Sequence, residues 1–296
     1  MTGEMAGSAL PRRLLGRQLR ELRERSGVSA VDARKAISVS QQTLWRIESG
    51  QSGVKLRPHD VRALCDLYRA ADAVTRRLLA LAEETKSAGW WHAYSDAIPK
   101  EFDLFVGLEE AANRSTGYQS TLLPGLLQTL EYRRALIWVE YPTISTENVE
   151  RRLEISTRRQ TRLTGDTKSL ALNVILNEAV LRHDVGGPAV MRAQLKQLAN
   201  IGGQPNVSIR VVPIDASIHR GLIVGPFTIL EFPPHPTTYL TEPPVVYVEG
   251  YTGDLYLEKS NEVKQYRQAF ADIERSALTE DQSCRLFLNI AEEQGI

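Results

Sequence analysis

The sequence predicts an all-helical N-terminal domain followed by an α+β domain with a mainly antiparallel sheet. The chain has 296 residues, a length that suits about two domains. Up to residue 87 the apolar residues recur at helical spacing, whereas five strand-like segments follow residue 169. We therefore expect a flexible tail at 1–11, a helical domain at 12–87 and an α+β domain at 88–296.

Five short helices are expected in the first domain, each marked by an apolar stripe or by a residue suited to a helix end. The signals in order are the stripe Leu15, Leu19 and Leu22 closed by Gly27, the caps Ser29 and Ser40 of helices at 29–37 and 40–49, Pro58 in a first turn, and the stripe Val74, Leu78 and Leu81. Five helices in so short a segment predict a compact bundle.

The second domain mixes helices and strands after a connector at 87–99 that contains Trp90 and Trp91. Helices are expected at FVGLEEAAN, TLEYRRALIWVE, 148–163, GGPAVMRAQLKQLANIG, 260–276 and 279–294. Strands are expected at 170–176, NVSIRVVPI, PFTILEF, PVVYVEG and DLYLEK, and GYTG joins the last two as a hairpin. Because most strands follow one another in sequence, we expect an α+β domain.

The charge of the chain is uneven although its net value is zero. Residues 1–89 hold 16 Lys and Arg against 10 Asp and Glu, a net charge of +6, so residues 90–296 carry −6. A basic segment suits an anionic partner, although basic faces are also common on proteins that bind none.

The composition excludes several classes of protein. No run of about 18 apolar residues occurs and the N-terminus lacks a signal-peptide core, so we expect a cytoplasmic protein that does not span a membrane. The two cysteines, Cys65 and Cys284, are too few for a disulfide framework, and each is expected as a small core residue.

The segment SQQTLWRIESG, from Ser40 to Gly50, is expected to form the second helix of a helix-turn-helix pair. Leu44 and Ile47 are expected to point inward together with Val31 and Ile37. The outer side of the helix then carries Gln41, Gln42, Thr43 and Arg46. Gln pairs with the adenine edge and Arg with the guanine edge in the major groove, so this face suits base readout. The alternative is a helical bundle whose short third helix is solvated and binds nothing.

Residues 14–70 resemble the phage-repressor, xenobiotic-response-element type of helix-turn-helix, through SQQTLWRIESG with LRELRERSGVS before it and VRALCDLY after it. The resemblance implies that Gln41, Gln42 and Arg46 contact bases or adjacent phosphates. Three residues depart from the pattern: Ala30 replaces a phosphate-binding Gln, Arg34 a small packing Ala, and Ser38 the turn Gly. Arg34 is instead a candidate phosphate contact.

The expected DNA-binding set also includes five further residues: Thr43, Trp45, Lys55, Arg57, and Ser40 as the cap of the helix. Trp45 has two interpretations: we expect it to pack on the domain rim, and the alternative is stacking against sugar and phosphate. Neutralising Lys55 or Arg57 is expected to weaken binding to all DNA sequences alike.

The remainder resembles the domain that follows the helix-turn-helix in a large group of actinobacterial regulators. The segments that carry the resemblance are, in order, GWWHAYSDAIPKEFDLFVGLEEAA, YQSTLLPGLLQTLEYRRA, NEAVLRHDVGGPAVMRAQLKQL, PNVSIRVVP and GPFTILEF with VVYVEGYTGDLYLEK. The resemblance implies an antitoxin-like domain of unknown function, whose gene commonly sits beside one for a small partner protein.

The second domain shows no pattern of catalytic, metal-binding or cofactor-binding residues. Its histidines have no metal-ligand spacing, and neither a phosphate loop nor a nucleophile elbow is evident. His219, in a Gly-rich loop, is a candidate partner contact, or else a loop histidine bound to backbone. Tyr247, Tyr251 and Tyr256 are further candidates if they face outward, and otherwise they pack under the terminal helices.

Three functions follow from these patterns. The first is a sequence-specific transcriptional regulator that binds double-stranded DNA as a homodimer and senses a ligand or a small protein encoded by the adjacent gene. The second is an antitoxin that neutralises such a partner and represses its own gene. The third, an enzyme tethered to a DNA-binding domain, lacks a convergent catalytic set, so we expect no enzymatic activity.

Overall fold

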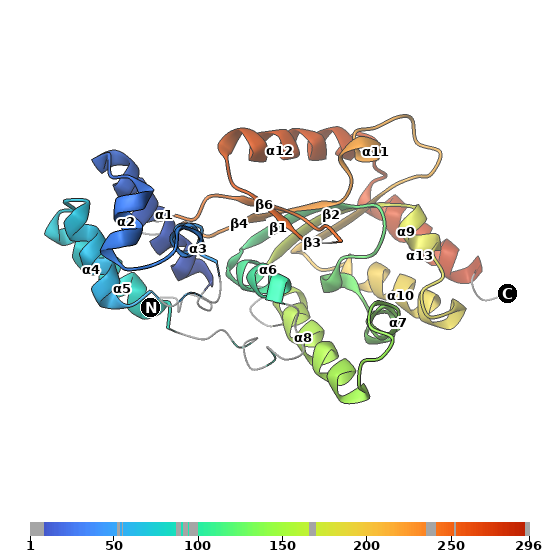
Figure 1. Cartoon of the computed structure of the whole chain (residues 1–296). Coiled ribbons are helices and arrows are strands. Elements are labelled where there is room, and N and C mark those ends of the chain that lie inside the picture. Colours follow the sequence, from blue (N-terminus) through green and yellow to red (C-terminus); the bar gives the residue numbers. More distant parts are fainter. Residues whose placement is uncertain are drawn as a thin grey trace. The chain divides into compact units, whose positions relative to one another are not determined.

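The computed structural model of the chain describes residues 9–51, 54, 56–86, 90, 94, 100–165, 170–234, 241–251 and 253–293 (Figure 1). The chain divides into two compact units. Unit 1 comprises Met1–Ala111 with Pro234–Glu242, and unit 2 comprises Ala112–Pro233 with Pro243–Ile296. Unit 1 is therefore discontinuous in sequence, because a short segment from the second half of the chain belongs to it.

Unit 1 is helical, but it extends beyond the expected bounds of 12–87 and also contains the helix that was expected at the start of the second domain. Its helices are α1 (Ala9–Ser26), α2 (Ala30–Ala36), α3 (Gln41–Glu48), α4 (Pro58–Leu67), α5 (Asp72–Glu84) and α6 (Lys100–Ala111). The first five confirm the five predicted helices. Helix α1 begins at Ala9, with Pro11 in its first turn, where the missing N–H of proline removes no helical hydrogen bond. The expected tail at 1–11 is thus too long by the three residues Ala9–Pro11.

The core of unit 1 is made by apolar side chains of α1 to α5. Its fully buried members include Leu14, Leu19, Ala33, Leu44, Val61, Leu64, Cys65 and Leu78. The inward position of Leu44 and Ile47 is confirmed, since they are 2% and 7% exposed. The expectation for Val31 is wrong: this side chain is 42% exposed, because Ala33 is the buried residue of α2.

Unit 2 contains a six-stranded mixed sheet of order β3-β2-β1-β4-β5-β6. The strands are β1 (Arg114–Gln119), β2 (Ala171–Asn177), β3 (Val207–Val212), β4 (Phe227–Glu231), β5 (Val245–Val248) and β6 (Leu255–Leu257). Strands β1, β2 and β3 pair in parallel, and the β1–β4, β4–β5 and β5–β6 pairs are antiparallel. The mainly antiparallel α+β fold and the β5–β6 hairpin are confirmed.

Strand β1 was not predicted from the sequence, although it lies inside the sheet. Its segment RSTGYQ has only one large apolar residue, Tyr118, which is fully buried. Gly117 allows β4 to approach, because a Cβ at this position would lie 2.6 Å from the carbonyl oxygen of Phe227. The strand is thus stabilised by its neighbours rather than by its own hydrophobic pattern.

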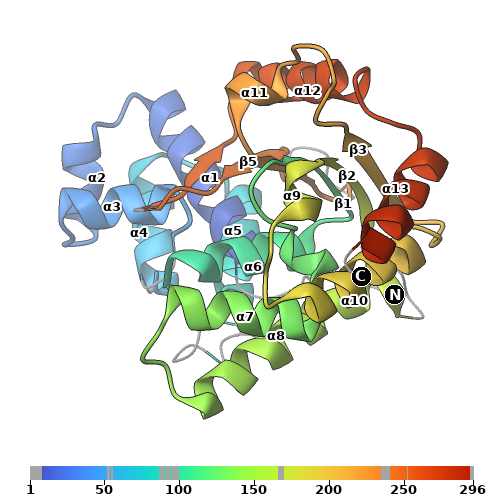
Figure 2. The same cartoon turned by 90° about the vertical axis from the view of Figure 1, so that its right-hand side faces the viewer.

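Helices cover both faces of this sheet. They are α7 (Leu130–Glu140), α8 (Thr146–Thr164), α9 (Ala179–Arg182), α10 (Pro188–Ile201), α11 (Gly221–Val224), α12 (Ser260–Glu274) and α13 (Glu280–Glu293), with the 3-10 turn η2 (Gly125–Leu127). Helix α12 lies on one face, and α7, α8 and α10 lie on the other (Figures 1 and 2). On the α12 face, Val263, Phe270 and Ile273 pack against Tyr118, Phe227 and Val246. Among the described residues, none of the helices has the length and apolar character needed to cross a lipid bilayer.

Candidate DNA-binding surface

Helix α3 begins at a side-chain cap, as the sequence predicts. The Ser40 hydroxyl oxygen accepts a hydrogen bond from the Thr43 N–H at 3.0 Å, and it lies 2.9 Å from the Thr43 hydroxyl oxygen. Ser29 caps α2 in the same way, through the Asp32 N–H at 3.1 Å. The Ser40 and Thr43 side chains are therefore engaged with each other, and their main contribution to the surface is to fix where α3 starts.

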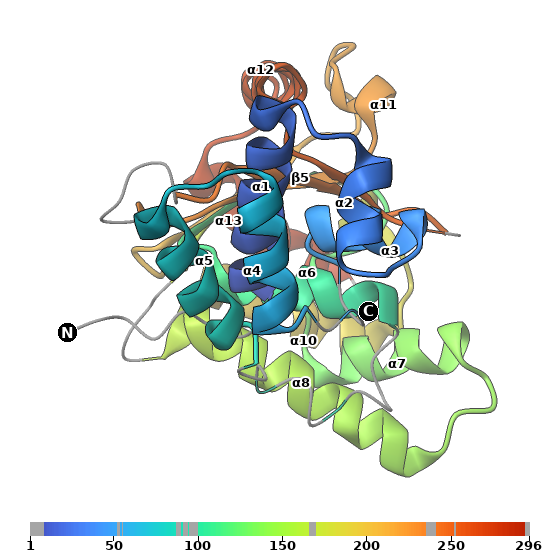
Figure 3. The ribbon, with the colours of Figure 1, turned by 60° about the vertical axis from the view of Figure 1, so that its left-hand side comes forward.

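The outer face of α3 presents the residues that suit base readout. Gln41 and Gln42 are exposed in the first turn, and Arg46 is half-buried one turn later. Helices α2 and α3 lie side by side in unit 1 (Figure 3). This arrangement places two amide side chains at the helix end that enters a major groove in helix-turn-helix proteins.

Trp45 lies on the same exposed face and is 57% exposed. More than half of this side chain is open to solvent, which leaves the indole available for a contact while the rest of it is covered. A single exposed apolar residue is common on protein surfaces, so Trp45 is a candidate contact only because it shares the outer face of α3 with Gln41 and Gln42.

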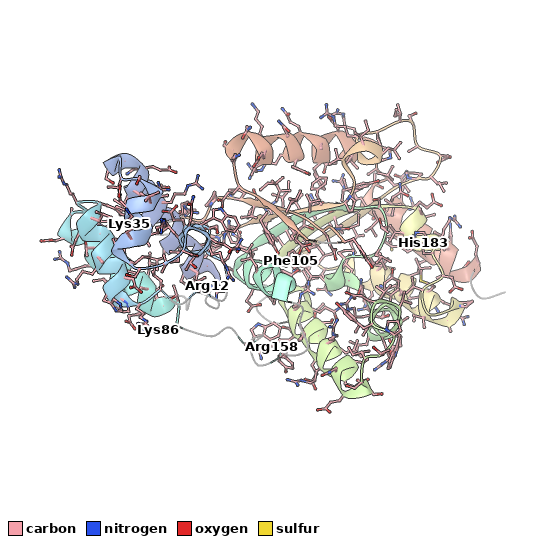
Figure 4. All side chains as sticks on the ribbon, viewed as in Figure 1. Arg12, Lys35, Lys86, Phe105, Arg158 and His183 are labelled. Carbon is pink, nitrogen blue, oxygen red and sulfur yellow. The ribbon has the colours of Figure 1, made fainter. Side chains whose placement is uncertain are left out.

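Helix α2 contributes cationic groups beside α3. Arg34 is half-buried, and its Nε atom is buried without a hydrogen-bond partner. Lys35, labelled in Figure 4, is exposed in the same turn and was missed by sequence reasoning. The sequence does contain a signal for Lys35, since Arg34 and Lys35 are adjacent basic residues in the last turn of α2.

The turn between α2 and α3 contains a strained residue. Ser38 has φ of +54°, a left-handed conformation that glycine adopts without cost. This is the position at which the sequence departs from the glycine of similar domains. The helix-turn-helix geometry is thus kept in spite of the substitution.

The remaining DNA-binding candidates lie elsewhere in unit 1. Arg57 is exposed at the N-terminus of α4, where its backbone N–H donates to the Asp60 carboxylate at 3.0 Å. Lys55 lies outside the residues that the structure describes. The structure therefore brings Gln41, Gln42 and Trp45 together on α3 and leaves Arg57 on a separate element.

An ion pair between Arg23 and Glu48 connects α1 to α3. The Arg23 guanidinium donates two hydrogen bonds to Glu48, at 2.6 Å and 2.9 Å, and this hydrogen bonding raises the pKa of Arg23. Both groups are largely shielded from solvent, with 15% and 9% of their side chains exposed. The pair fixes the C-terminal turn of α3 and keeps Glu48, the only acidic residue of this helix, away from its outer face.

A second buried cluster of charges in unit 1 was not predicted. The Glu242 carboxylate accepts from Arg13 Nε at 2.9 Å and from Arg17 Nη1 at 2.7 Å. Arg13 and Arg17 stand one turn apart on α1, a spacing visible in the sequence, but Glu242 is 229 residues away from Arg13. No local pattern could have identified this partner.

The partner-binding candidates of unit 2 do not form one outward surface. His219 is 8% exposed, accepts from the Gly221 N–H at Nδ1 (3.1 Å), and has its pKa lowered by burial. This confirms the interpretation of a loop histidine bound to backbone. Tyr247 is 6% exposed and packs against Tyr256 at 5.3 Å between ring centroids, so of the two interpretations left open, the outward orientation is excluded for this residue. Only Tyr251 is fully exposed among these three tyrosines.

Burial also determines the chemistry of these residues. Desolvation is the main cause that raises the pKa of Tyr247, so this phenol stays neutral over the physiological range. Cys65 is buried and Cys284 half-buried, and neither forms a disulfide. Within the described residues, His, Cys, Asp and Glu side chains form no group of three that could hold a metal ion.

Comparisons with known protein families match two successive parts of the chain, a helix-turn-helix domain first and a second domain after it. The helix-turn-helix domain profile matches residues 14–79, and the profile of a domain of unknown function, DUF5753, matches residues 102–289. Neither the curated proteins nor the solved structures gave a match. The first of these matches agrees with helices α1 to α5, and it supports a DNA-binding regulator.

Proposed function

This chain belongs to the DUF5753 family and carries a helix-turn-helix domain, and from this premise we propose that it is a sequence-specific transcriptional regulator of the xenobiotic-response-element type. The observation that carries the proposal is the exposed pair Gln41 and Gln42 at the start of a capped α3. The sequence resemblance adds that such regulators occur in actinobacteria. We propose regulation without catalysis.

In the proposed complex, α3 enters the major groove by its N-terminal end. The amides of Gln41 and Gln42 read base edges, Arg46 contacts a base or the adjacent phosphate, and the exposed Trp45 stacks against sugar and phosphate. Phosphate contacts come from Arg34 and Lys35 of α2 and from Lys55 and Arg57. The net charge of +6 in residues 1–89 supports this assignment, since cationic groups supply the sequence-independent part of DNA affinity.

A shift assay of the intact chain with its own promoter DNA and with random duplex tests this proposal. Gln42→Ala should relax base preference at one operator position and cost about 1–3 kcal/mol there. The matched control is Gln268→Ala, which removes an exposed glutamine from α12 of unit 2. Equal affinity of the unmodified chain for promoter and random DNA would refute sequence-specific binding.

We further propose that the chain acts as a homodimer with its contacts in residues 90–296. One recognition helix contacts only a few base pairs, so two helices about one DNA turn apart double the readout. An exposed aliphatic group supports the location: Ile214, Ile218, Leu222 and Ile223, all 65% exposed or more, lie between β3 and β4. Light scattering should give a dimer, and Ile218→Asp should weaken it, while Val139→Asp on α7 should not.

Residues 90–296 are also proposed to bind a small ligand or the small protein encoded by the adjacent gene. The fully exposed Tyr251 at the β5–β6 hairpin suits a contact surface, because tyrosine combines a large apolar area with a polar end. A pull-down with that protein, followed by a shift assay with and without it, tests this role. Toxicity of the neighbouring gene when expressed alone would favour the antitoxin interpretation.

A further inference from the structure

The buried carboxylate of Glu242 holds the first helix of the DNA-binding unit from a distant part of the sequence. Only 1% of its side chain is exposed, against 7% for Arg13 and 20% for Arg17. Arg17 Nη2 also donates to the Thr241 carbonyl oxygen at 3.4 Å. The segment that follows β4 is therefore attached to α1 through one carboxylate, two guanidinium groups and a backbone oxygen.

Arg13 contacts the end of the recognition helix with another part of the same residue. Gly50, the second residue after α3, has φ of +67°, and a Cβ built there would lie 2.5 Å from Arg13 Cα and 2.7 Å from Arg13 Cγ. The α3 terminus thus rests on the backbone and the aliphatic stem of Arg13. The guanidinium at the other end of that stem is held by Glu242.

The burial of Glu242 explains why this carboxylate needs two cationic partners. A carboxylate buried this far is stable only when cationic partners and hydrogen bonds replace its water. Arg13 and Arg17 use separate oxygens of the carboxylate, so Glu242 orients both guanidinium groups at once. Fixing the Arg13 guanidinium also fixes the rotamer of the stem against which Gly50 packs.

We propose that Glu242 is a positioning residue for DNA recognition, acting through Arg13 on the C-terminal end of α3. The proposal rests on the proposed function and adds the residue that sets the orientation of the recognition helix. Loss of the carboxylate removes one anchor of the Arg13 guanidinium, which loosens the support of Gly50 and lets α3 change its angle. Sequence-specific contacts then weaken more than phosphate contacts, because base readout needs closer geometry.

The test compares Glu242→Gln with Glu24→Gln in the full chain. Both variants remove one carboxylate that binds an α1 arginine, but the Glu24–Arg20 pair, at 2.9 Å, is exposed. In Glu242→Gln the ratio of specific to random-duplex affinity should fall by about three- to tenfold, and in Glu24→Gln it should stay unchanged. Glu242→Asp keeps the buried charge with a shorter side chain, so it should fold where the glutamine variant does not and lower the ratio less.

Hydrogen exchange without DNA separates this proposal from the proposed function. The α3 amides should exchange faster in Glu242→Gln than in the unmodified chain, whatever the chain binds. Unchanged α3 exchange and an unchanged affinity ratio, with only a lower melting temperature, would make Glu242 a structural residue and overturn the proposal. A chain that binds no DNA selectively would refute the proposed function, and the exchange experiment would still decide the positioning role.

Discussion

Gly16 of α1 and Ile47 of α3 are in backbone contact: a Cβ built on Gly16 would lie 2.2 Å from the carbonyl oxygen of Ile47. No larger residue fits without moving one helix away from the other, since the obstructing atom belongs to the backbone. The contact lies three residues from Arg13 on the same helix. Helix α3 and the residues just after it thus approach α1 at two points, Ile47 at Gly16 and Gly50 at Arg13.

Gly16→Ala should therefore displace α3 and destabilise the unit by about 1–3 kcal/mol, the usual cost of overpacking. Urea unfolding measures the loss of stability, and a shift assay measures the loss of DNA affinity. Gly203→Ala is the control, because a Cβ there would meet only the Asn200 carbonyl oxygen at 3.4 Å. Equal stability of both variants would contradict the backbone contact.

Ser38→Gly should stabilise the protein by about 0.5–1 kcal/mol, because glycine adopts a positive φ without the clash of a Cβ. The gain is partial, since glycine also increases the entropy of the unfolded chain. Ser26→Gly, at a residue without positive φ, should lower stability instead. Thermal unfolding of the two variants tests the opposite signs. A loss of stability in Ser38→Gly would show that the turn is not strained.

The buried His219 predicts a pH dependence of stability. Burial lowers its folded pKa below the unfolded value, so the unfolded state binds the proton more readily. The contribution of this group is complete above the unfolded pKa of about 6.5, and it is lost as the pH falls toward the folded value. His219→Gln should reduce the drop in melting temperature between pH 7.5 and pH 5.5.

The control for this prediction is His183→Gln, which replaces an exposed histidine (Figure 4). This variant should keep the pH dependence of the unmodified chain. The same melting-temperature drop in His219→Gln and in the unmodified chain would assign the pH dependence to other groups.

Trp45→Ala should lower DNA affinity while leaving the stability of the protein nearly unchanged. The exposed indole contributes little packing, so unfolding free energy should change by less than about 0.5 kcal/mol. DNA affinity should fall by about 1 kcal/mol if the ring stacks on the DNA backbone. Trp138→Ala, on α7 and 39% exposed, is the control and should leave DNA affinity unchanged. Unaltered DNA binding by Trp45→Ala would show that Trp45 is not part of the DNA-binding surface.

The sequence predicted those parts of the fold that depend on neighbours within a few residues. The caps Ser29 and Ser40 and the helical stripes fall in this class, because each signal lies inside the element that it marks. Strand β1 does not, since RSTGYQ has no alternating apolar pattern and obtains its partners from β2 and β4.

The orientation of side chains, inward or outward, was harder to predict than secondary structure. Alternation in β5 suggested that Tyr247 faces outward, but Val245, Val246 and Tyr247 are all buried. A strand covered on both faces shows no polar side, so alternation cannot indicate which residues face outward. The 57% exposure of Trp45 likewise depends on how other elements pack around α3, which the local sequence does not indicate. Of the DNA-binding candidates, the α3 face was found from sequence, and the support beneath it, Arg13 with Glu242, was not.

The discontinuity of unit 1 has a consequence during protein synthesis. Helix α1 leaves the ribosome long before its buried partner, since Arg13 and Glu242 are 229 residues apart. At about 5–20 residues per second, that interval lasts roughly 10 to 45 s. Until it ends, Arg13 and Arg17 lack their carboxylate. A nascent chain that carries the complete helix-turn-helix sequence therefore still lacks one buried contact of α1, which forms only after the segment between β4 and β5 has been synthesised.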